Sequence, residues 1–319
     1  ARRARRDPRR GRGSHPSVEG NGTSFVTRRP KSRLPPKLPD PARDRTPAPP
    51  KAPSRRERLK DAHVAGRSAR FLRDDVVRIM RALVRRETGA TLGLPPFAEL
   101  TMDQAAAAAE LVFGWDGDGP RARIDPARTV DGFTAACARV LEVARGGGRI
   151  AFATGRPASL LGLHRALLGA ASAAGGEVLR ATESGPIDAR DRRIWWVDGV
   201  ATVSDGESLL ADDSTAAADE LLFLLPRPDL LVGDRAFAGT AAGSGLEVVA
   251  FAGLDAIALA VAAWRGMAVR VVPLDEHRPP QAYAPLLELL EEAVRAPQPD
   301  PVVPDLVRPS DPFGSRTGR

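Results

Sequence analysis

Short apolar runs alternate with longer helical patterns along residues 149–273, and this alternation leaves few folds open. The runs with strand character are 149–154, 177–181, 229–234, 247–251 and 268–273. Buried strands separated by helices are typical of a parallel sheet that is covered on both faces. We therefore predict an open, mostly parallel α/β sheet with helices on both faces over residues 127–295.

One segment departs from the alternation. The stretch RIWWVDGVATVS (193–204) contains two strand-like runs separated by Asp198-Gly199. Asp-Gly is a preferred two-residue turn between antiparallel strands. The sequence therefore predicts one β-hairpin inserted into the α/β domain.

Residues 61–126 have helical patterns but no comparable strand run. An apolar face predicts a helix over 67–87, and Thr101 precedes a second run of helix formers. A Gly/Asp/Pro-rich loop is expected over 114–126. We therefore predict an α-helical N-terminal region that covers the α/β domain.

The chain ends differ from this body in composition. Residues 1–60 contain 15 arginines and 4 lysines against 5 acidic residues, a net charge of +14, whereas the whole chain has +7. Residues 1–60 and 296–319 are proline-rich, so we expect flexible, disordered tails. Nucleic acid is expected to bind at most weakly, through the basic tail. Deleting residues 1–56 is expected to leave stability and ligand binding unchanged.

Residue counts narrow the chemistry further. All four lysines lie at or before residue 60, so a mechanism in the body cannot depend on lysine. The single cysteine, Cys137, lies in an apolar helical pattern and is expected to be a core residue. No apolar run reaches about 18 residues, so we expect no membrane span and a cytoplasmic protein.

Polar residues follow the predicted strands, and ligands in such sheets bind beyond the carboxyl ends of the strands. The residues in these positions are Thr154, Gly155 and Arg156; Asp212, Asp213 and Ser214; Asp234 and Arg235; Asp255; and Asp275, Glu276 and His277. Carboxylates can hold a divalent cation, and arginine, hydroxyl and amide groups can hold phosphate. The rim therefore predicts a site for a phosphorylated small molecule.

Each of these residues receives an expected role. Asp234, Asp275 and Asp213 are the expected catalytic residues. The expected phosphate-binding residues are Thr154, Gly155, Arg156, Arg235 and Ser214. Asp234, Asp212 and Asp275 are the expected ligands of Mg²⁺ or another divalent cation.

Purely structural roles are the alternative for several of these residues. Asp213 could cap the following helix, Asp275 could pair with Arg270, and His277 could simply be exposed. His164 is expected to be an ordinary helix histidine. The strand-end rule makes two checkable predictions: Thr154 and Asp234 lie within about 12 Å, and at least one clustered carboxylate has a raised pKa.

Three motifs resemble those of haloacid-dehalogenase-like phosphatases. They are LVFGWDGDG (111–119), AFATGRP (151–157) and LLVGDRAFAGTAAGSGLEVVAF (230–251). Against this resemblance, the residues before Asp116 have a helical pattern, the body has no lysine, and Ala238-Gly239 stand where a second acid is usual. This family stays an alternative.

A longer stretch, about 124–290, resembles an actinobacterial family known only by the name phosphatase. The matching segments are IDPARTVD (124–131), FATGRP (152–157), ADDSTAA (211–217), GDRAFAGTAAG (233–243), FAGLDAIAL (251–259) and PLDEHR (273–278). The resemblance implies an α/β fold and a phosphatase-like activity. The family's histidines are replaced here by Arg156, Ala211, Asp213 and Arg235.

Two functions follow as expectations. The first is a hydrolase of small phosphate esters, with a metal as an optional partner. The second is a catalytically degenerate paralogue that binds a phosphorylated metabolite or nucleotide, because the polar rim differs from the family while its glycines persist. The oligomeric state is open.

Overall fold

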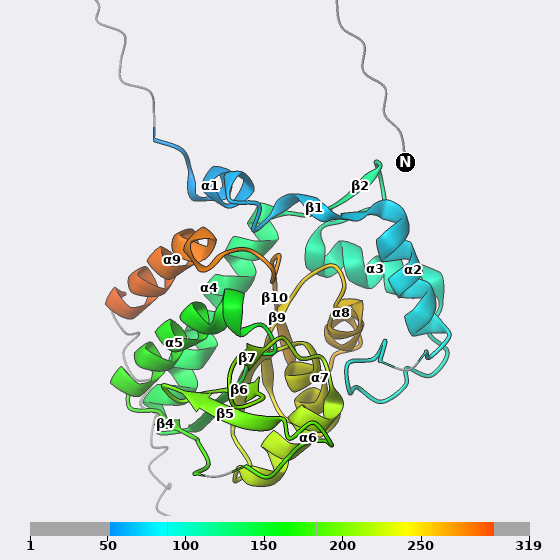
Figure 1. Ribbon diagram of the computed structural model, residues 1–319. Helices are drawn as coiled ribbons and strands as arrows, with labels where there is room; N and C mark the ends of the chain where they lie inside the picture. Colours follow the sequence, from blue (N-terminus) through cyan, green and yellow to red (C-terminus); the bar gives the residue numbers. More distant parts are fainter. Residues whose placement is uncertain (1–51, 88, 183, 297–319) are drawn as a thin grey trace, which may run out of the picture. The chain divides into compact units, whose positions relative to one another are not determined.

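The computed structural model of the protein describes residues 52–296, apart from 88 and 183. This part of the chain is drawn in Figure 1, and its centre is a five-stranded parallel sheet with the order β10-β9-β8-β3-β4. The strands are β3 (Arg149–Phe152), β4 (Glu177–Val178), β8 (Leu230–Asp234), β9 (Val248–Ala252) and β10 (Val269–Pro273). The predicted parallel α/β sheet is therefore confirmed, and every predicted strand run contributes to it.

The strand order has a functional consequence. After β3 the chain goes to one side of the sheet, to β4, and then returns to the other side, to β8. The reversal makes the boundary between β3 and β8 a topological switch point, where open α/β sheets bind ligands. β8 and β9 have no exposed residue, so ligand binding here depends on the loops that follow their carboxyl ends.

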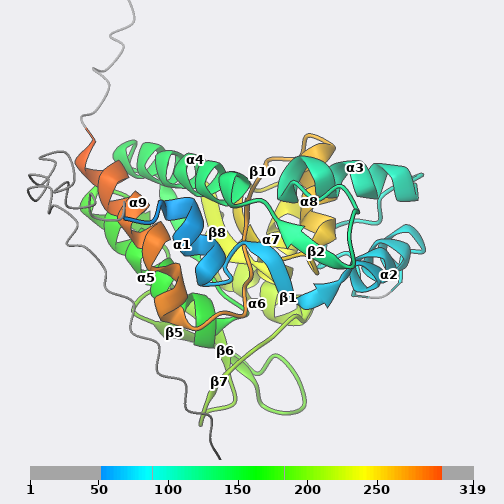
Figure 2. The same cartoon turned by 90° about the horizontal axis from the view of Figure 1, so that it is seen from above.

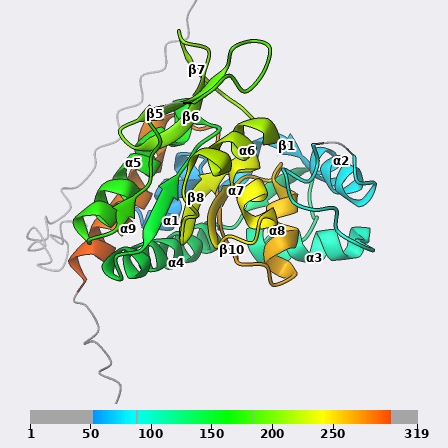
Figure 3. The same cartoon turned by 90° about the horizontal axis from the view of Figure 1, so that it is seen from below.

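Helices cover both faces of this sheet (Figures 2 and 3). One face carries α4 (Pro126–Arg145), α5 (Pro157–Ala173) and α9 (Ala284–Arg295), which contact one another. The opposite face carries α6 (Thr215–Leu224), α7 (Arg235–Gly243) and α8 (Ile257–Trp264). A short 3-10 helix, η1 (Pro280–Tyr283), precedes α9. Cys137 lies in α4 with no exposed surface, which confirms its predicted place in the core.

The predicted hairpin is also confirmed. β5 (Arg193–Val197) pairs with β6 (Val200–Ser204), and β7 (Leu209–Leu210) adds a third antiparallel strand. Asp198 and Gly199 both have positive φ, as a tight turn between two strands requires. The Thr154 amide donates to the Ala201 carbonyl at 2.9 Å, so the hairpin is attached to the end of β3.

The predicted helix over 67–87 is wrong in its first third. Residues Gly66–Leu72 form β1, which pairs antiparallel with β2 (Arg121–Ile124), and α2 runs only over Arg73–Val84. The apolar pattern that predicted a longer helix belongs to α2, whose buried side chains are Val76, Met80 and Leu83. The presence of β2 also corrects the loop expected over 114–126, and β1 and β2 add a strand pair to the predicted α-helical N-terminal region.

The predicted end of the N-terminal tail, at residue 60, falls inside a helix. Residues 1–51 and 297–319 lie outside the described part, but Arg55–Asp61 form α1, which begins at a Ser54–Glu57 capping box. Leu59 has no exposed surface, and Arg58 donates to Glu288 of α9 at 2.6 Å. Deleting residues 1–56 would therefore remove the cap of a packed helix, contrary to the expectation of no effect.

The second N-terminal helix agrees with its prediction. The Thr101 hydroxyl accepts from the Gln104 amide, and α3 (Met102–Phe113) follows and packs on α8. The described residues belong to a single compact unit. Among them, no helix is both long and apolar enough to cross a membrane.

Candidate functional site

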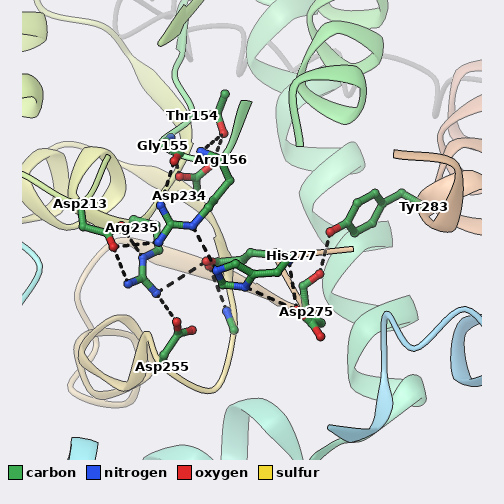
Figure 4. A network of polar contacts seen from close by, with 12 residues as sticks. Thr154, Gly155, Arg156, Asp213, Asp234, Arg235, Asp255, Asp275, His277 and Tyr283 are labelled. Carbon is green, nitrogen blue, oxygen red and sulfur yellow. Dashed lines mark hydrogen bonds and ion pairs between the residues drawn. The ribbon is translucent and has the colours of Figure 1, made fainter. Parts of the chain in front are cut away.

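Thr154 and Asp234 meet at the switch point between β3 and β8. The Thr154 hydroxyl donates to Asp234 Oδ2 at 2.5 Å, and the Gly155 amide donates to Asp234 Oδ1 at 2.7 Å (Figure 4). The prediction that Thr154 and Asp234 lie within about 12 Å is therefore confirmed. Both side chains have no exposed surface. Asp234 thus holds the first residues of the loop that follows β3.

Close backbone packing explains the glycine in this loop. The Asp212 amide donates to the Gly155 carbonyl at 3.0 Å. A Cβ on residue 155 would lie 2.2 Å from the Asp212 carbonyl oxygen, far inside van der Waals contact. The loop after β3 and the loop before α6 are therefore locked against each other, and only glycine permits their approach.

The environment of Asp234 changes its titration. Burial raises the pKa of Asp234, although the nearby His164 and the bonds from Thr154 and Gly155 oppose the shift. Burial lowers the pKa of His164, whose Nδ1 lies 3.0 Å from the Leu160 carbonyl and whose ring packs edge-on against Phe251. His164 is therefore a buried core residue of α5, as predicted for an ordinary helix histidine, and it is close enough to Asp234 to affect its pKa.

Two arginines converge on one carboxylate beside this pair. Arg235 donates to both oxygens of Asp213, at 2.8 and 3.0 Å, and Arg156 donates to Asp213 Oδ2 at 2.8 Å. The two arginine side chains are each 10% exposed, whereas the Asp213 side chain is 44% exposed. Burial opposes ionisation of Asp213, but the two arginines outweigh it and lower its pKa. We call Arg156, Arg235 and Asp213 the arginine cluster.

A sharp turn positions Arg235. It is the first residue of α7, directly after β8, and its φ is +51°, in the left-handed region that is unfavourable for a side chain. Such strained residues persist where the surrounding structure fixes them, and they are concentrated at functional sites. The structural alternative for Asp213 is wrong, because Ser214 is the N-cap residue of α6 and Asp213 binds the two arginines instead.

Arg235 also reaches the far side of the rim. Its Nη1 lies 2.8 Å from Asp255 Oδ2 and 3.7 Å from Glu276 Oε2. Glu276 has no exposed surface and accepts from the Gly253 amide at 3.0 Å. Burial raises the pKa of Glu276 well above its ordinary value, Asp255 and Asp234 add to the shift, and Arg235 opposes it. The prediction of at least one raised carboxylate pKa is therefore confirmed.

Glu276 has no role among the sequence-based assignments. Little in the sequence indicates that Glu276 is buried in the site, because an acidic residue that follows a strand is usually exposed to solvent. Asp275 and Glu276 are adjacent residues just after β10, and side chains of adjacent residues in an extended chain point to opposite sides. This was the one indication in the sequence that the two carboxylates have different surroundings.

Asp275 and His277 form a further pair next to the arginine cluster. Asp275 Oδ1 accepts from the His277 amide at 3.0 Å and lies 3.5 Å from His277 Nδ1. Arg156 Nε donates to His277 Nε2 at 3.3 Å. The His277 side chain is 23% exposed, so the expectation of a simply exposed histidine is wrong. The alternative pairing of Asp275 with Arg270 is also wrong, since Arg270 faces Glu247 at 3.5 Å.

The backbone of Asp275 is held from two sides. The Tyr283 hydroxyl donates to its carbonyl at 2.6 Å, and its amide donates to the Val64 carbonyl at 2.8 Å. Burial raises the pKa of Tyr283, which therefore stays protonated and able to donate. The segment before β1 is thus attached directly to the rim of the sheet.

The carboxylates expected to bind a metal face different partners. Asp212 pairs with Arg192 and accepts from the Ser214 amide at 2.6 Å and hydroxyl at 2.5 Å, while Asp234 and Asp275 have the contacts given above. Among residues 52–296, with the two gaps noted, no group of three or more His, Cys, Asp or Glu is arranged to hold a metal ion. Asp212, Asp234 and Asp275 each have protein partners in this arrangement, and binding of a divalent cation by them stays a prediction.

The Asp-x-Asp-Gly stretch lies elsewhere. Asp116 follows α3, accepts from the Asp118 amide at 3.0 Å and lies 3.8 Å from Arg123. It does not follow a strand of the parallel sheet, which is the position a haloacid-dehalogenase-like nucleophile would need.

Comparison with known proteins agrees with this picture. The sequence model of a family described as Phosphatase matches residues 51–297. A protein of Streptomyces coelicolor named Phosphatase SCO2771 is 34% identical over 177 residues, which cover 53% of this chain and 67% of that protein. These matches confirm the resemblance found in the sequence, and the chain belongs to the Phosphatase family.

Proposed function

We propose that this protein hydrolyses phosphate monoesters of small molecules at the arginine cluster. The observation that carries the proposal is the convergence of Arg156 and Arg235, from the ends of neighbouring strands, on one partly exposed carboxylate. A guanidinium group presents paired N–H donors that match carboxylate and phosphate oxygens alike. Asp213 therefore marks an anion position that solvent can reach.

Asp213 has to move away from Arg156 and Arg235 before phosphate can bind to these two arginines. It lies in the loop before α6, and a dianionic phosphate would be repelled by a carboxylate at the same place. The exposed fraction of its side chain leaves it a path into solvent. We assign to Asp213 the role of holding the two arginines together until phosphate replaces it.

His277 is positioned for proton transfer. It touches Arg156, and Asp275 lies beside its other ring nitrogen. In the proposed reaction a water oxygen bonds to phosphorus and the ester P–O bond breaks. His277 gives a proton to the departing oxygen and regains one from the water that has attacked, so the products are the free alcohol and inorganic phosphate. The arginines stabilise the charge that develops on the phosphoryl oxygens. Asp275 acts as a positioning residue for His277.

No step of this proposal uses a metal, because the carboxylates of the site are paired with arginines and backbone amides. Activity is therefore expected to persist after chelator treatment. Loss of activity in chelator, with recovery on addition of Mg²⁺ or Mn²⁺, would show that the carboxylates regroup around a cation.

One observation favours a second function, binding without turnover. Asp213, Asp255 and Glu276 surround the arginines, so the positive charge of the cluster is offset within the protein itself. When neighbouring carboxylates neutralise the arginines, the cluster can still bind a phosphorylated metabolite or nucleotide, but it has less positive charge to stabilise the transition state of hydrolysis. The experiment below separates the two functions.

The test measures phosphate release from a panel of small phosphate monoesters by the full chain and by Arg156→Ala and Arg235→Ala. We expect either substitution to lower kcat/KM at least 100-fold, which corresponds to about 2.7 kcal/mol. Arg165→Ala is the matched control, because Arg165 pairs with Asp198 on an exposed surface, and it should retain full activity. Asp213→Ala should bind inorganic phosphate more tightly than the unaltered chain.

Three outcomes decide between the functions. Turnover that survives both arginine substitutions contradicts the proposed site. Tight binding of esters with no release of phosphate supports the second function. Weaker binding of inorganic phosphate by Asp213→Ala would show that Asp213 helps to bind the anion and does not compete with it.

A further inference from the structure

A small pocket lies between the segment that leads into β1 and the ends of β9 and β10. Its lining includes Val64, Phe71, Leu254, Asp255, Asp275 and His277. We call it the β1 pocket. It is partly enclosed and leaves room for little more than one group the size of a water molecule.

Two carboxylates that line this pocket each have one oxygen without a hydrogen-bond partner. Asp275 Oδ2 and Asp255 Oδ1 are buried and accept no hydrogen bond from any described residue. The second oxygen of each carboxylate is occupied: Asp275 Oδ1 by the His277 amide, and Asp255 Oδ2 by Arg235. The Asp275 side chain is only 10% exposed, so solvent reaches it poorly. A buried acceptor without a donor is unfavourable, and the pocket is therefore suited to a ligand that brings donors.

The nearby basic side chains do not supply those donors. The His277 ring faces the occupied oxygen of Asp275, at 3.5 Å. Arg67 and His63 also line the pocket, but both are exposed, and neither forms an ion pair with Asp255 or Asp275 in the described structure. Arg235 already offsets the charge of Asp255, so the charge of Asp275 and the two oxygens without partners are left for a ligand to engage.

The size and walls of the pocket narrow the class of ligand. A primary ammonium group is about as large as a water molecule, carries a positive charge and has three donors, enough for both oxygens. Phe71 and Leu254 also line the pocket, so the carbon atom next to the ammonium group can contact apolar side chains. A guanidinium or quaternary ammonium group exceeds the available room.

Two residues that line the β1 pocket also contact the arginine cluster. Asp255 lines the pocket and pairs with Arg235 at 2.8 Å, while His277 lines the pocket and contacts Arg156 at 3.3 Å (Figure 4). A ligand with a phosphate at one end and an ammonium group at the other can therefore span both places. Resting on the proposed function, we infer that the substrates are phosphate monoesters of short amino alcohols, whose ammonium group binds Asp275 and Asp255.

The test uses phosphonates, whose C–P bond this reaction does not break, so binding is measured apart from turnover. Aminoalkylphosphonates with two, three and four carbons between phosphorus and nitrogen are compared with alkylphosphonates in which a methyl group replaces the ammonium group. Calorimetry on the full chain should show at least tenfold tighter binding of one aminoalkylphosphonate than of its matched alkylphosphonate. In Asp275→Asn this ratio should fall to near one, while binding of the alkylphosphonate persists.

Two further variants keep the test decisive. Asp229→Asn removes a carboxylate that pairs with Arg149, at the opposite end of the sheet, and should retain the preference. Asp255→Asn serves if Asp275→Asn does not fold, which thermal melting reveals, and it should reduce the preference as well.

The outcomes separate this inference from the proposed function. Equal binding of the two phosphonates overturns the inference, as does a preference that survives both Asp275→Asn and Asp255→Asn. If uncharged esters are hydrolysed without any preference for amino esters, only the ammonium site fails. If no phosphonate binds at millimolar concentration and no ester is hydrolysed, both proposals fail.

Discussion

The two halves of the sheet edge use carboxylates in opposite ways. At the ends of β3 and β8, both oxygens of Asp234 accept hydrogen bonds, and the side chain is fully buried. At the ends of β9 and β10, Asp255, Asp275 and Glu276 each retain an oxygen without a hydrogen-bond partner among the described residues. The first half therefore fixes the backbone of the site, whereas the second half has unused acceptors that a ligand can engage.

The largest expected difference between the halves is in stability. Asp234→Ala leaves the Thr154 hydroxyl and the Gly155 amide buried without an acceptor, and it should lower the free energy of unfolding by about 3 kcal/mol. Asp275→Ala removes one acceptor, that of the His277 amide, and should cost about 1 kcal/mol. Denaturant unfolding of both variants measures the difference. Equal costs would show that the halves are built alike.

Two glycines provide a matched pair for the next prediction. A Cβ at Gly155 would meet the Asp212 carbonyl at 2.2 Å, whereas a Cβ at Gly253 would meet Asp255 Oδ1 at 2.9 Å. The first contact is with backbone; the second is with a side-chain oxygen that has no hydrogen-bond partner among the described residues and can move. We expect Gly155→Ala to lower the free energy of unfolding by about 2 kcal/mol and Gly253→Ala by under about 1 kcal/mol. A larger loss in Gly253→Ala would contradict the view that the second half is adaptable.

The last expected effect concerns pH and is spread over several pH units. Burial raises the pKa of Glu276 well above its ordinary value of 4.5, so the folded state binds this proton more tightly than the unfolded state. Stability should therefore fall as the pH rises from about 4.5 through the folded pKa, by at most about 1.4 kcal/mol per pH unit. Glu276→Gln cannot titrate and should flatten this decline.

Asp234→Asn is the comparison variant for the pH experiment. The pKa of Asp234 is also raised by burial, so its contribution has the same sign. We expect the Glu276 variant to flatten the decline more, since two neighbouring carboxylates add to the shift of Glu276, whereas hydrogen bonds from Thr154 and Gly155 oppose that of Asp234. Unfolding curves collected between about pH 5 and pH 8 provide the measurement. If only Asp234→Asn changes the slope of the free energy of unfolding against pH, the pH dependence arises from the ends of β3 and β8 and not from Glu276.

Local patterns were sufficient to predict the sheet and the first half of the site. Apolar runs give strands, parallel strands share their carboxyl ends, and this rule alone brings Thr154 close to Asp234. The same reasoning failed where partners come from distant segments. Asp212 pairs with Arg192, which precedes the hairpin, and no local pattern indicates that contact.

Two further errors have a similar origin. β1 becomes a strand because β2, much later in the chain, provides its partner, whereas the sequence pattern placed Phe71 of β1 on the apolar face of the following helix. His277 follows charged residues and precedes two prolines, which is typical of an exposed loop, yet Arg156 draws it into the rim across 121 residues of sequence. Long-range arginine contacts thus determine the parts of the site that sequence patterns did not predict.

The burial of Cys137 gives this protein a built-in reporter of its own opening. The sequence has one thiol, it has no exposed surface in α4, and burial raises its pKa to about 12. A thiol reagent can react only with molecules in which α4 has separated from the sheet, because the folded state offers neither access nor thiolate. The labelling rate therefore counts opening events of the core without any added dye or engineered probe. Ligands that tighten the sheet should slow that rate in proportion to how firmly they bind.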